Sequence, residues 1–95
     1  VSELINVGGR KVHPAEIESV LGEIDGIESA YVYGKEDPIT GNSVACDITT
    51  SLEKEGREWK RAIRSYCRGK LAPWKIPSIV KLVDELKLTH RMKRS

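Results

Sequence analysis

The sequence has no long apolar run, few cysteines and little net charge. No stretch approaches the roughly 20 apolar residues that a helix needs to cross a bilayer, which excludes a membrane span. Cys46 and Cys67 are too few for a disulfide framework, and each lies in an apolar periodic pattern, so we expect reduced core thiols in a cytoplasmic protein. Lys and Arg number 16 against 14 Asp and Glu, and this near balance disfavours nucleic acid as the main partner.

Signals for export, metal binding and nucleophilic catalysis are also missing. No basic segment followed by an apolar stretch opens the chain, and the start at Val1 suggests a piece of a longer protein. His13, Cys46, Cys67 and His90 do not fall at the close spacing of zinc ligands, so we expect no metal site. No Ser or Cys has a recognisable base partner.

The 95 residues suit one small domain, residues 1–95, with no internal repeat and no dividing linker. A domain of this length is short for an enzyme that must enclose two substrates by itself. A fragment of an enzyme or a binding module is therefore the better expectation.

A glycine pair near the start joins two short extended segments. Residues 4–7 and 10–13 are predicted to be extended, and Gly8 and Gly9 lie between them, where a missing Cβ allows a tight turn or close approach to a ligand. Taken alone, such a pair usually means only a turn. The spacing also fits neither a dinucleotide fingerprint nor a phosphate loop.

Periodicity predicts two helices and three further strands. The first helix begins at Pro14, has a stripe at i, i+3, i+4 and i+7, and is ended by Gly26; the second covers about residues 53–70. Strands are expected at 29–34, 43–50 and about 78–83. The sequence thus predicts an α+β fold: a small central sheet, two main helices on one or both of its faces, and a short N-terminal two-stranded element.

Two basic clusters stand out from this balanced composition. The second helix carries positive side chains on the face opposite its apolar stripe, and the chain ends in a further group. The helix residues are Lys60, Arg61, Arg64 and Arg68, and the tail residues are His90, Arg91, Lys93 and Arg94. Such clusters are most often solvated surface, and attraction to a polyanion is the alternative.

Four separated segments, in this order, resemble the C-terminal domain of the acyl-adenylate-forming enzymes, in a style closest to acyl-CoA synthetases. The segments are "INVGGRKVHPAEIESVL", "SAYVYGKEDPITGNSVA", "YCRGKLAPWKIPSIVKLVDEL" and "LTHRMK". The resemblance covers essentially the whole chain. It implies a lid domain of a larger ligase that uses ATP and Mg²⁺, held mainly by an N-terminal domain, to join a carboxylic acid to the thiol of CoA or a carrier protein.

The resemblance also implies roles for individual residues. Lys93 would be the adenylation lysine, Gly8 and Gly9 would lie on the loop that lines the pantetheine tunnel in the second step, and Ser2 would occupy the hinge. The small domain would rotate between the two half-reactions. By itself it would be inactive.

The sequence departs from the family pattern around these residues. Met92 replaces the usual Gly before the lysine, and Ser2 is not the usual Asp or Lys; Lys87 and Arg94 also replace a frequent Pro and an apolar residue. Met requires ordinary backbone geometry, so the lysine loop differs here if the family glycine has a positive φ. Arg91 is the alternative to Lys93 as the positive residue that serves adenylation.

Two other hypotheses for the function remain besides a domain of an active ligase. One is a catalytically weak domain of the same family, and the other is an interaction module that uses Arg61, Arg64, Arg68 and the tail to bind an acidic partner such as a carrier protein.

Overall fold

The computed structural model describes residues 4–39 and 41–84 of the chain. The described part forms a compact arrangement of strands and helices in the order that the sequence predicted. The elements are β1 (Ile5–Val7), β2 (Arg10–Val12), α1 (Pro14–Leu21), β3 (Ile27–Asp37), β4 (Gly41–Thr50), α2 (Gly56–Cys67), the short 3₁₀ helix η1 (Pro73–Lys75) and β5 (Ile79–Leu82). None of the described helices is long and apolar enough to cross a membrane.

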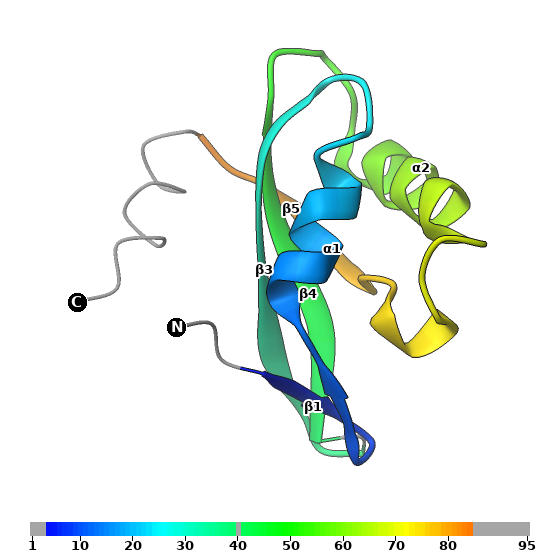
Figure 1. The fold of residues 1–95 in the computed structure, drawn as a ribbon. Coiled ribbons are helices and arrows are strands. Elements are labelled where there is room, and N and C mark those ends of the chain that lie inside the picture. The colour runs from blue at the N-terminus through cyan, green and yellow to red at the C-terminus, as the bar shows by residue number, and fades with distance from the viewer. Residues whose placement is uncertain (1–3, 40, 85–95) are drawn as a thin grey trace.

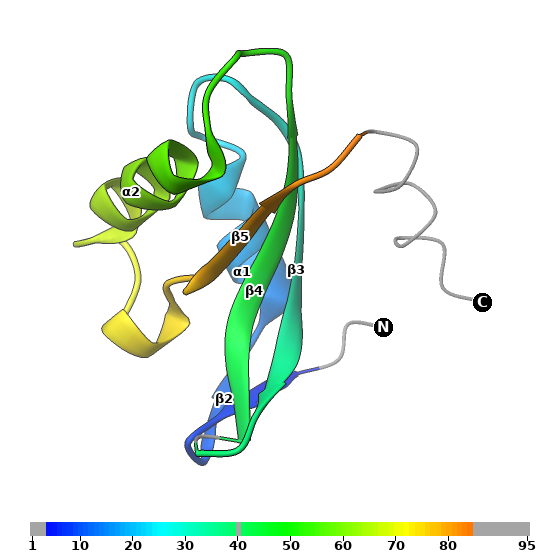
Figure 2. The ribbon, with the colours of Figure 1, turned by 180° about the vertical axis from the view of Figure 1, so that it is seen from behind.

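The strands form two sheets. β1 and β2 make an antiparallel pair, and β3, β4 and β5 make a second sheet in that order, with β4 antiparallel to β3 and parallel to β5. Both helices cover the same face of the three-stranded sheet (Figures 1 and 2). The predicted α+β fold is therefore confirmed, and of the two packing arrangements that the sequence allowed, the structure has the one-sided one.

The core lies between the three-stranded sheet and the two helices. Val44, Cys46 and Ile48, alternate residues of β4, point into it, as the alternation predicted. The buried apolar residues are Ile5, Val12, Ile17, Leu21, Ile27, Val32, Val44, Cys46, Ile48, Trp59, Ile63 and Cys67. Because these residues come from both helices, the main sheet and the N-terminal hairpin, one core holds all parts of the described chain together.

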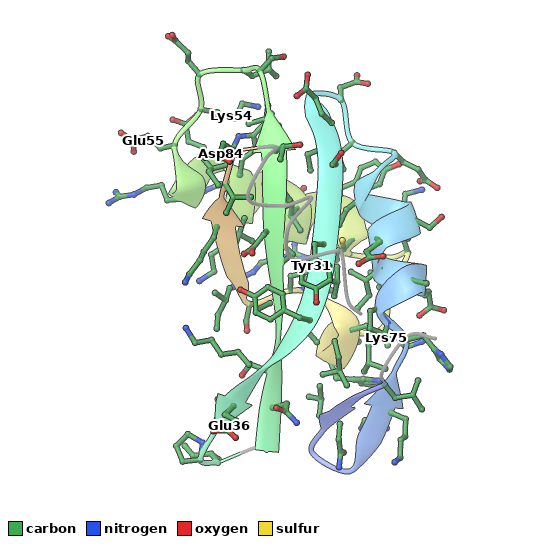
Figure 3. All side chains as sticks on the ribbon, turned by 90° about the vertical axis from the view of Figure 1, so that its left-hand side faces the viewer. Tyr31, Glu36, Lys54, Glu55, Lys75 and Asp84 are labelled. Atoms are coloured by element: carbon green, nitrogen blue, oxygen red, sulfur yellow. The ribbon has the colours of Figure 1, made fainter. Side chains whose placement is uncertain are left out.

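The opposite face of the sheet carries a tyrosine pair over a buried carboxylate. The rings of Tyr31 and Tyr33 stack with centroids 5.5 Å apart, and the Tyr33 hydroxyl donates a 3.1 Å hydrogen bond to Oδ1 of Asp47. Tyr31 lies on the side of the sheet away from the helices (Figure 3). Asp47 is fully buried, which the alternation along β4 did not predict, since it placed this residue on the outward side of the strand.

The first helix ends earlier than the sequence predicted. It stops at Leu21, and Gly26, which was expected to end it, lies in the following turn with φ +97°. A Cβ at Gly26 would collide with the side chain of Leu52 and approach Trp59 to 3.0 Å. Gly26 is therefore needed for close packing of this turn, and the apolar stripe, which continues to Ile24, could not show where helical hydrogen bonding stops.

The second helix is also shorter than the predicted range of about 53–70. It begins after Glu55 and ends at Cys67, whose carbonyl accepts the N–H groups of Lys70 and Leu71 at 2.9 Å. Gly69 has φ +92° within this turn. A glycine at positive φ closes the helix end because it accepts the left-handed conformation without a Cβ clash.

A glutamate of α1 covers the open edge of β3. Oε2 of Glu18 accepts the backbone N–H of Val32 at 2.8 Å. Among the described strands, β3 lies at an edge of its sheet, so its outer N–H groups have no strand partner there. A charged acceptor satisfies this donor and fixes α1 against the sheet.

We expect Glu18→Ala to lower the free energy of unfolding by about 1 to 3 kcal/mol, because a partly buried N–H loses a charged acceptor. Glu18→Gln should lose less, since its amide oxygen can still accept. Glu16→Ala is the matched control on the same helix: Glu16 makes an exposed ion pair with Lys75, worth under about 1 kcal/mol. Urea unfolding measures all three. Equal losses for Glu16→Ala and Glu18→Ala would show that the bond to Val32 contributes nothing.

Both cysteines are free and buried in the core, as predicted. Burial, followed by the nearby Asp47 and Cys67, raises the pKa of the Cys46 thiol from 9.0 to about 12, and burial also raises the pKa of Cys67. The native state therefore holds neutral thiols at pH values where an unfolded chain would begin to ionise them.

This pKa difference makes stability fall at alkaline pH. The stabilisation from a neutral Cys46 is complete below pH 9.0 and is lost as the pH rises toward about 12, because only the unfolded state releases the proton in that window. The slope is at most about 1.4 kcal/mol per pH unit for one thiol. Urea unfolding of wild type and Cys46→Ala between about pH 7.5 and pH 10.5 tests this. Parallel slopes for the two proteins would refute it.

Candidate functional site

The hairpin of β1 and β2 turns through two glycines. Val7 pairs with Arg10 across the turn, and Gly8 and Gly9 between them have φ +56° and +86°. Positive φ at both central residues is what a type I′ turn requires, and Oδ1 of Asn6 accepts the N–H of Gly9 at 3.1 Å. A Cβ at either glycine would meet no atom within 4 Å. The turn therefore presents bare backbone to its surroundings, and both predicted glycines lie where the sequence placed them.

The core fixes the base of this hairpin. Ile5 and Val12 face each other across the two strands and are 4% and 0% exposed. Ile5 lies over Gly34 of β3, where an added Cβ would come within 3.0 Å of Cγ2 of Ile5. Gly34 thus allows the hairpin to pack closely on the main sheet. The glycine turn therefore extends from a base that is anchored in the core.

A cation–π contact joins the hairpin to η1. The guanidinium of Arg10, the first residue after the glycines, lies 4.1 Å from the ring centroid of Trp74. The next residue, Lys75, places Nζ 2.8 Å from Oε1 of Glu16 on α1, at the junction of the hairpin and the helix (Figure 3). Arg10 is exposed, and Trp74 keeps 39% of its surface exposed. The side of the hairpin next to the glycine turn therefore combines a positive charge with an aromatic ring.

The glycine turn and the end of the described chain lie at opposite ends of the sheet (Figures 1 and 2). The hairpin contacts the start of β4, where a Cβ on Gly41 would lie 3.8 Å from the carbonyl oxygen of Asn6. β5 leaves at the other end, where Leu82 pairs with Ile48. Gly41 and Ile48 are seven positions apart on β4, or about 23 Å along the strand at about 3.3 Å per residue.

Residues 16–93 of this chain match the sequence-family model that describes the AMP-binding enzyme C-terminal domain. This match covers more than half of the sequence. The chain belongs to the family of AMP-binding enzyme C-terminal domains.

Relatives of this C-terminal domain are ligases that are much longer than the chain. It is 36% identical over 85 residues to the 2-succinylbenzoate–CoA ligase of Geobacillus kaustophilus, with 90% of this chain and 17% of the relative covered. It is 37% identical over 90 residues to a mitochondrial medium-chain acyl-CoA ligase of Danio rerio, with 94% and 14% covered. The chain therefore spans about a sixth of the length of these relatives.

A solved structure has the same fold. The o-succinylbenzoate CoA synthetase of Bacillus subtilis, bound with a product analogue, superposes with a TM-score of 0.78 at 30% identity, covering 90% of this chain and 17% of that one. The fold of the C-terminal domain and the resemblance seen in the four sequence segments agree.

The structure describes some of the predicted site residues of this C-terminal domain and leaves others out. Gly8 and Gly9 form the turn described above. Ser2, Arg91 and Lys93, and with them Met92, lie outside the described residues. Their predicted roles therefore rest on the sequence motif and stay predictions.

Sequence reasoning missed the contact between Arg10 and Trp74. Both residues stood in segments that carried the family resemblance, "VGGR" and "APWKIP". A positive residue directly after a glycine pair and a tryptophan directly after a proline were the available signals. Only folding brings these two residues, 64 positions apart, into contact.

Proposed function

We propose that this chain is the mobile C-terminal domain of an ATP-dependent, AMP-forming acid–thiol ligase of the acyl-CoA synthetase type. Membership in the AMP-binding enzyme C-terminal domain family carries the proposal. The exposed glycine turn with its buried base supports it, because such a turn suits close approach of backbone to an extended ligand.

The first half-reaction would need positive charge at the α-phosphate of ATP. A carboxylate oxygen attacks the α-phosphorus, and pyrophosphate leaves with the electrons of the broken P–O bond. The ammonium of Lys93 would neutralise the carboxylate and the charge that accumulates on the phosphate oxygens. Lys93 is the catalytic residue in this proposal, and Arg91 is the competing cation of the same segment.

The second half-reaction would use the glycine turn. The thiol loses its proton, its sulfur attacks the acyl carbon of the adenylate, and AMP leaves as the C–O bond breaks. Gly8 and Gly9 would lie along the pantetheine arm of CoA or of a carrier protein, where open space at both Cβ positions leaves room for the arm. The relatives that are named as CoA ligases support a thiol acceptor of this kind.

Rotation of the domain would bring these two parts to one active site in turn. The glycine turn lies at one end of the sheet, and the described chain leads out at the other. Ser2 would be the hinge toward an N-terminal adenylating domain in the same protein, which would also hold most of the ATP and the Mg²⁺.

The test separates the two steps in the full-length protein. With ATP and a panel of carboxylic acids, we expect acid-dependent exchange of pyrophosphate into ATP, and release of AMP only when CoA or a phosphopantetheine thiol is added. Hydrolysis of ATP to ADP, or no dependence on any acid of the panel, would contradict the proposal.

A further inference from the structure

The outward face of α2 carries a row of positive side chains that the proposed chemistry does not use. Trp59, Ile63 and Cys67 occupy the buried side of the helix. The exposed cations opposite them are Arg57, Lys60, Arg61, Arg64 and Arg68, called here the α2 basic row. At 3.6 residues per turn the five lie within about 100° of one another around the axis and extend over about 16 Å.

This row is not neutralised within the part of the chain that the structure describes. The ion pairs found there use Lys70 and Lys75, and no member of the α2 basic row. Three pairs of like charge lie four residues apart, namely Arg57 with Arg61, Lys60 with Arg64, and Arg64 with Arg68. Such pairs destabilise a helix. Only Arg64, in the last turn, gains from the negative end of the helix dipole. The other repulsions are offset by no ion pair among the described residues, so the row keeps its full charge for an acidic partner.

The row is open to a partner. α2 lies at the side of the molecule, and no other described element covers its outer face (Figures 1 and 2). Four of the five cations are arginines, whose planar guanidinium groups bind carboxylates through two parallel hydrogen bonds.

We propose that the α2 basic row is a docking surface for a protein that presents an acidic helix. Carboxylates three and four residues apart on such a helix form a straight row with the same spacing as the cations, so the two rows can pair along about 16 Å.

Two other polyanions fit this surface less well. An anionic membrane is bound by helices that also expose large apolar side chains, and those of α2 are buried in the core. A nucleic acid is longer than the row and would continue past both of its ends. At the N-terminal end its phosphates would meet the negative side chains of Glu53, Glu55 and Glu58, of which Glu55 is labelled in Figure 3. The row also has no exposed aromatic side chain on which bases could stack.

The test measures binding of an acidic helical protein to the full-length protein that carries this domain. The probe is an acyl carrier protein in its apo form, and the choice of this probe rests on the proposed function. Because the apo form lacks the phosphopantetheine arm, its binding does not depend on the ligase chemistry. A protein that binds the probe but shows no acid-dependent pyrophosphate exchange would retain the docking surface and lose only the proposed function.

Charge reversal in the middle of the row gives the decisive variant. Arg61→Glu with Arg64→Glu turns the like-charge pairs at four-residue spacing into opposite-charge pairs, such as the pair formed by positions 64 and 68. These new pairs offset the carboxylate repulsion introduced between positions 61 and 64, so the change in helix stability should be small. The matched control is Lys35→Glu with Lys81→Glu, which makes the same change in net charge at exposed positions on β3 and β5. Thermal unfolding checks that both variants are folded.

We expect the row variant to weaken binding of the probe at least about tenfold at about 50 mM salt, and the control to change it less than about twofold. Raising the salt to about 300 mM should weaken binding of the wild type and remove most of this difference. Equal weakening by both variants would reduce the effect to net charge and overturn the proposal. No binding of the probe by wild type, or tighter row-dependent binding of a DNA duplex or of vesicles with anionic lipid, would also overturn it.

Discussion

Replacing Lys93 by Ala in the full-length protein should reduce acid-dependent pyrophosphate exchange at least about 100-fold, since loss of one positive group at a developing phosphate charge costs about 10²- to 10³-fold. Thioester formation from a supplied acyl adenylate should stay within about threefold, because that step no longer builds charge on the α-phosphate. The two half-reactions are measured separately, by isotope exchange and by release of AMP.

Arg91→Ala is the matched control for this lysine. It removes a cation two positions away and should leave both half-reactions nearly unchanged. If Arg91→Ala produced the selective loss instead, the catalytic role would pass to Arg91. Equal loss of both half-reactions in Lys93→Ala, or loss of neither, would refute the role of Lys93. Met92→Gly adds a further comparison, because a faster adenylation step would show that Met92 restricts the backbone of the lysine segment.

Gly8→Asn should impair the thiol step and leave adenylation nearly unchanged, the reverse of the effect expected for Lys93→Ala. The φ of +56° at Gly8 suits asparagine, and Asn-Gly is a favoured pair in a type I′ turn, so the hairpin should keep its shape. The new side chain would nevertheless occupy space that is now open at the turn. We expect kcat/KM for the thiol to fall at least about tenfold, because small displacements of a bound reactant are costly, with adenylation changed less than about threefold.

Gly69→Asn is the corresponding control. Gly69 also has a positive φ, +92°, and open space at its Cβ position, but it follows α2 rather than lying in the hairpin. Its two half-reactions should match those of the wild type. A similar loss in both glycine variants would point to a general effect on folding. An unchanged thiol step in Gly8→Asn would remove the glycine turn from the proposed tunnel.

Local sequence signals predicted most of the element order. The glycine pair favoured a turn because glycine adopts positive φ at no steric cost, and Pro14 favoured a helix start because the first helical position needs no N–H donor. The alternation of Val44, Cys46 and Ile48 identified the core side of β4. Element ends were less accurate, since apolar periodicity continues past the last helical hydrogen bond, as it does between Leu21 and Ile24.

Some features of the candidate site were also predicted from the sequence, and others were shown only by the structure. The motifs in the sequence selected Gly8, Gly9 and Lys93, and the structure places the two glycines on an anchored type I′ hairpin. The contact of Arg10 with Trp74 joins segments that are distant in sequence, and no local pattern encodes such a distance. Four of the five cations of the α2 basic row were predicted to share one helix face, and Arg57 was added only by the structure. Whether other parts of the chain neutralise these charges depends on packing.

The sequence by itself determined the family, the element order and the identity of the proposed reactive residues, because these depend on the types, order and spacing of residues along the chain. Only the tertiary structure decided that both helices cover one face of the sheet and that Asp47 is buried on the other. It also decided that Glu18 protects the edge of β3 and that the glycine turn lies at the opposite end of the sheet from the exit of β5. These features are set by contacts between residues far apart in the chain, which only the packed core brings together.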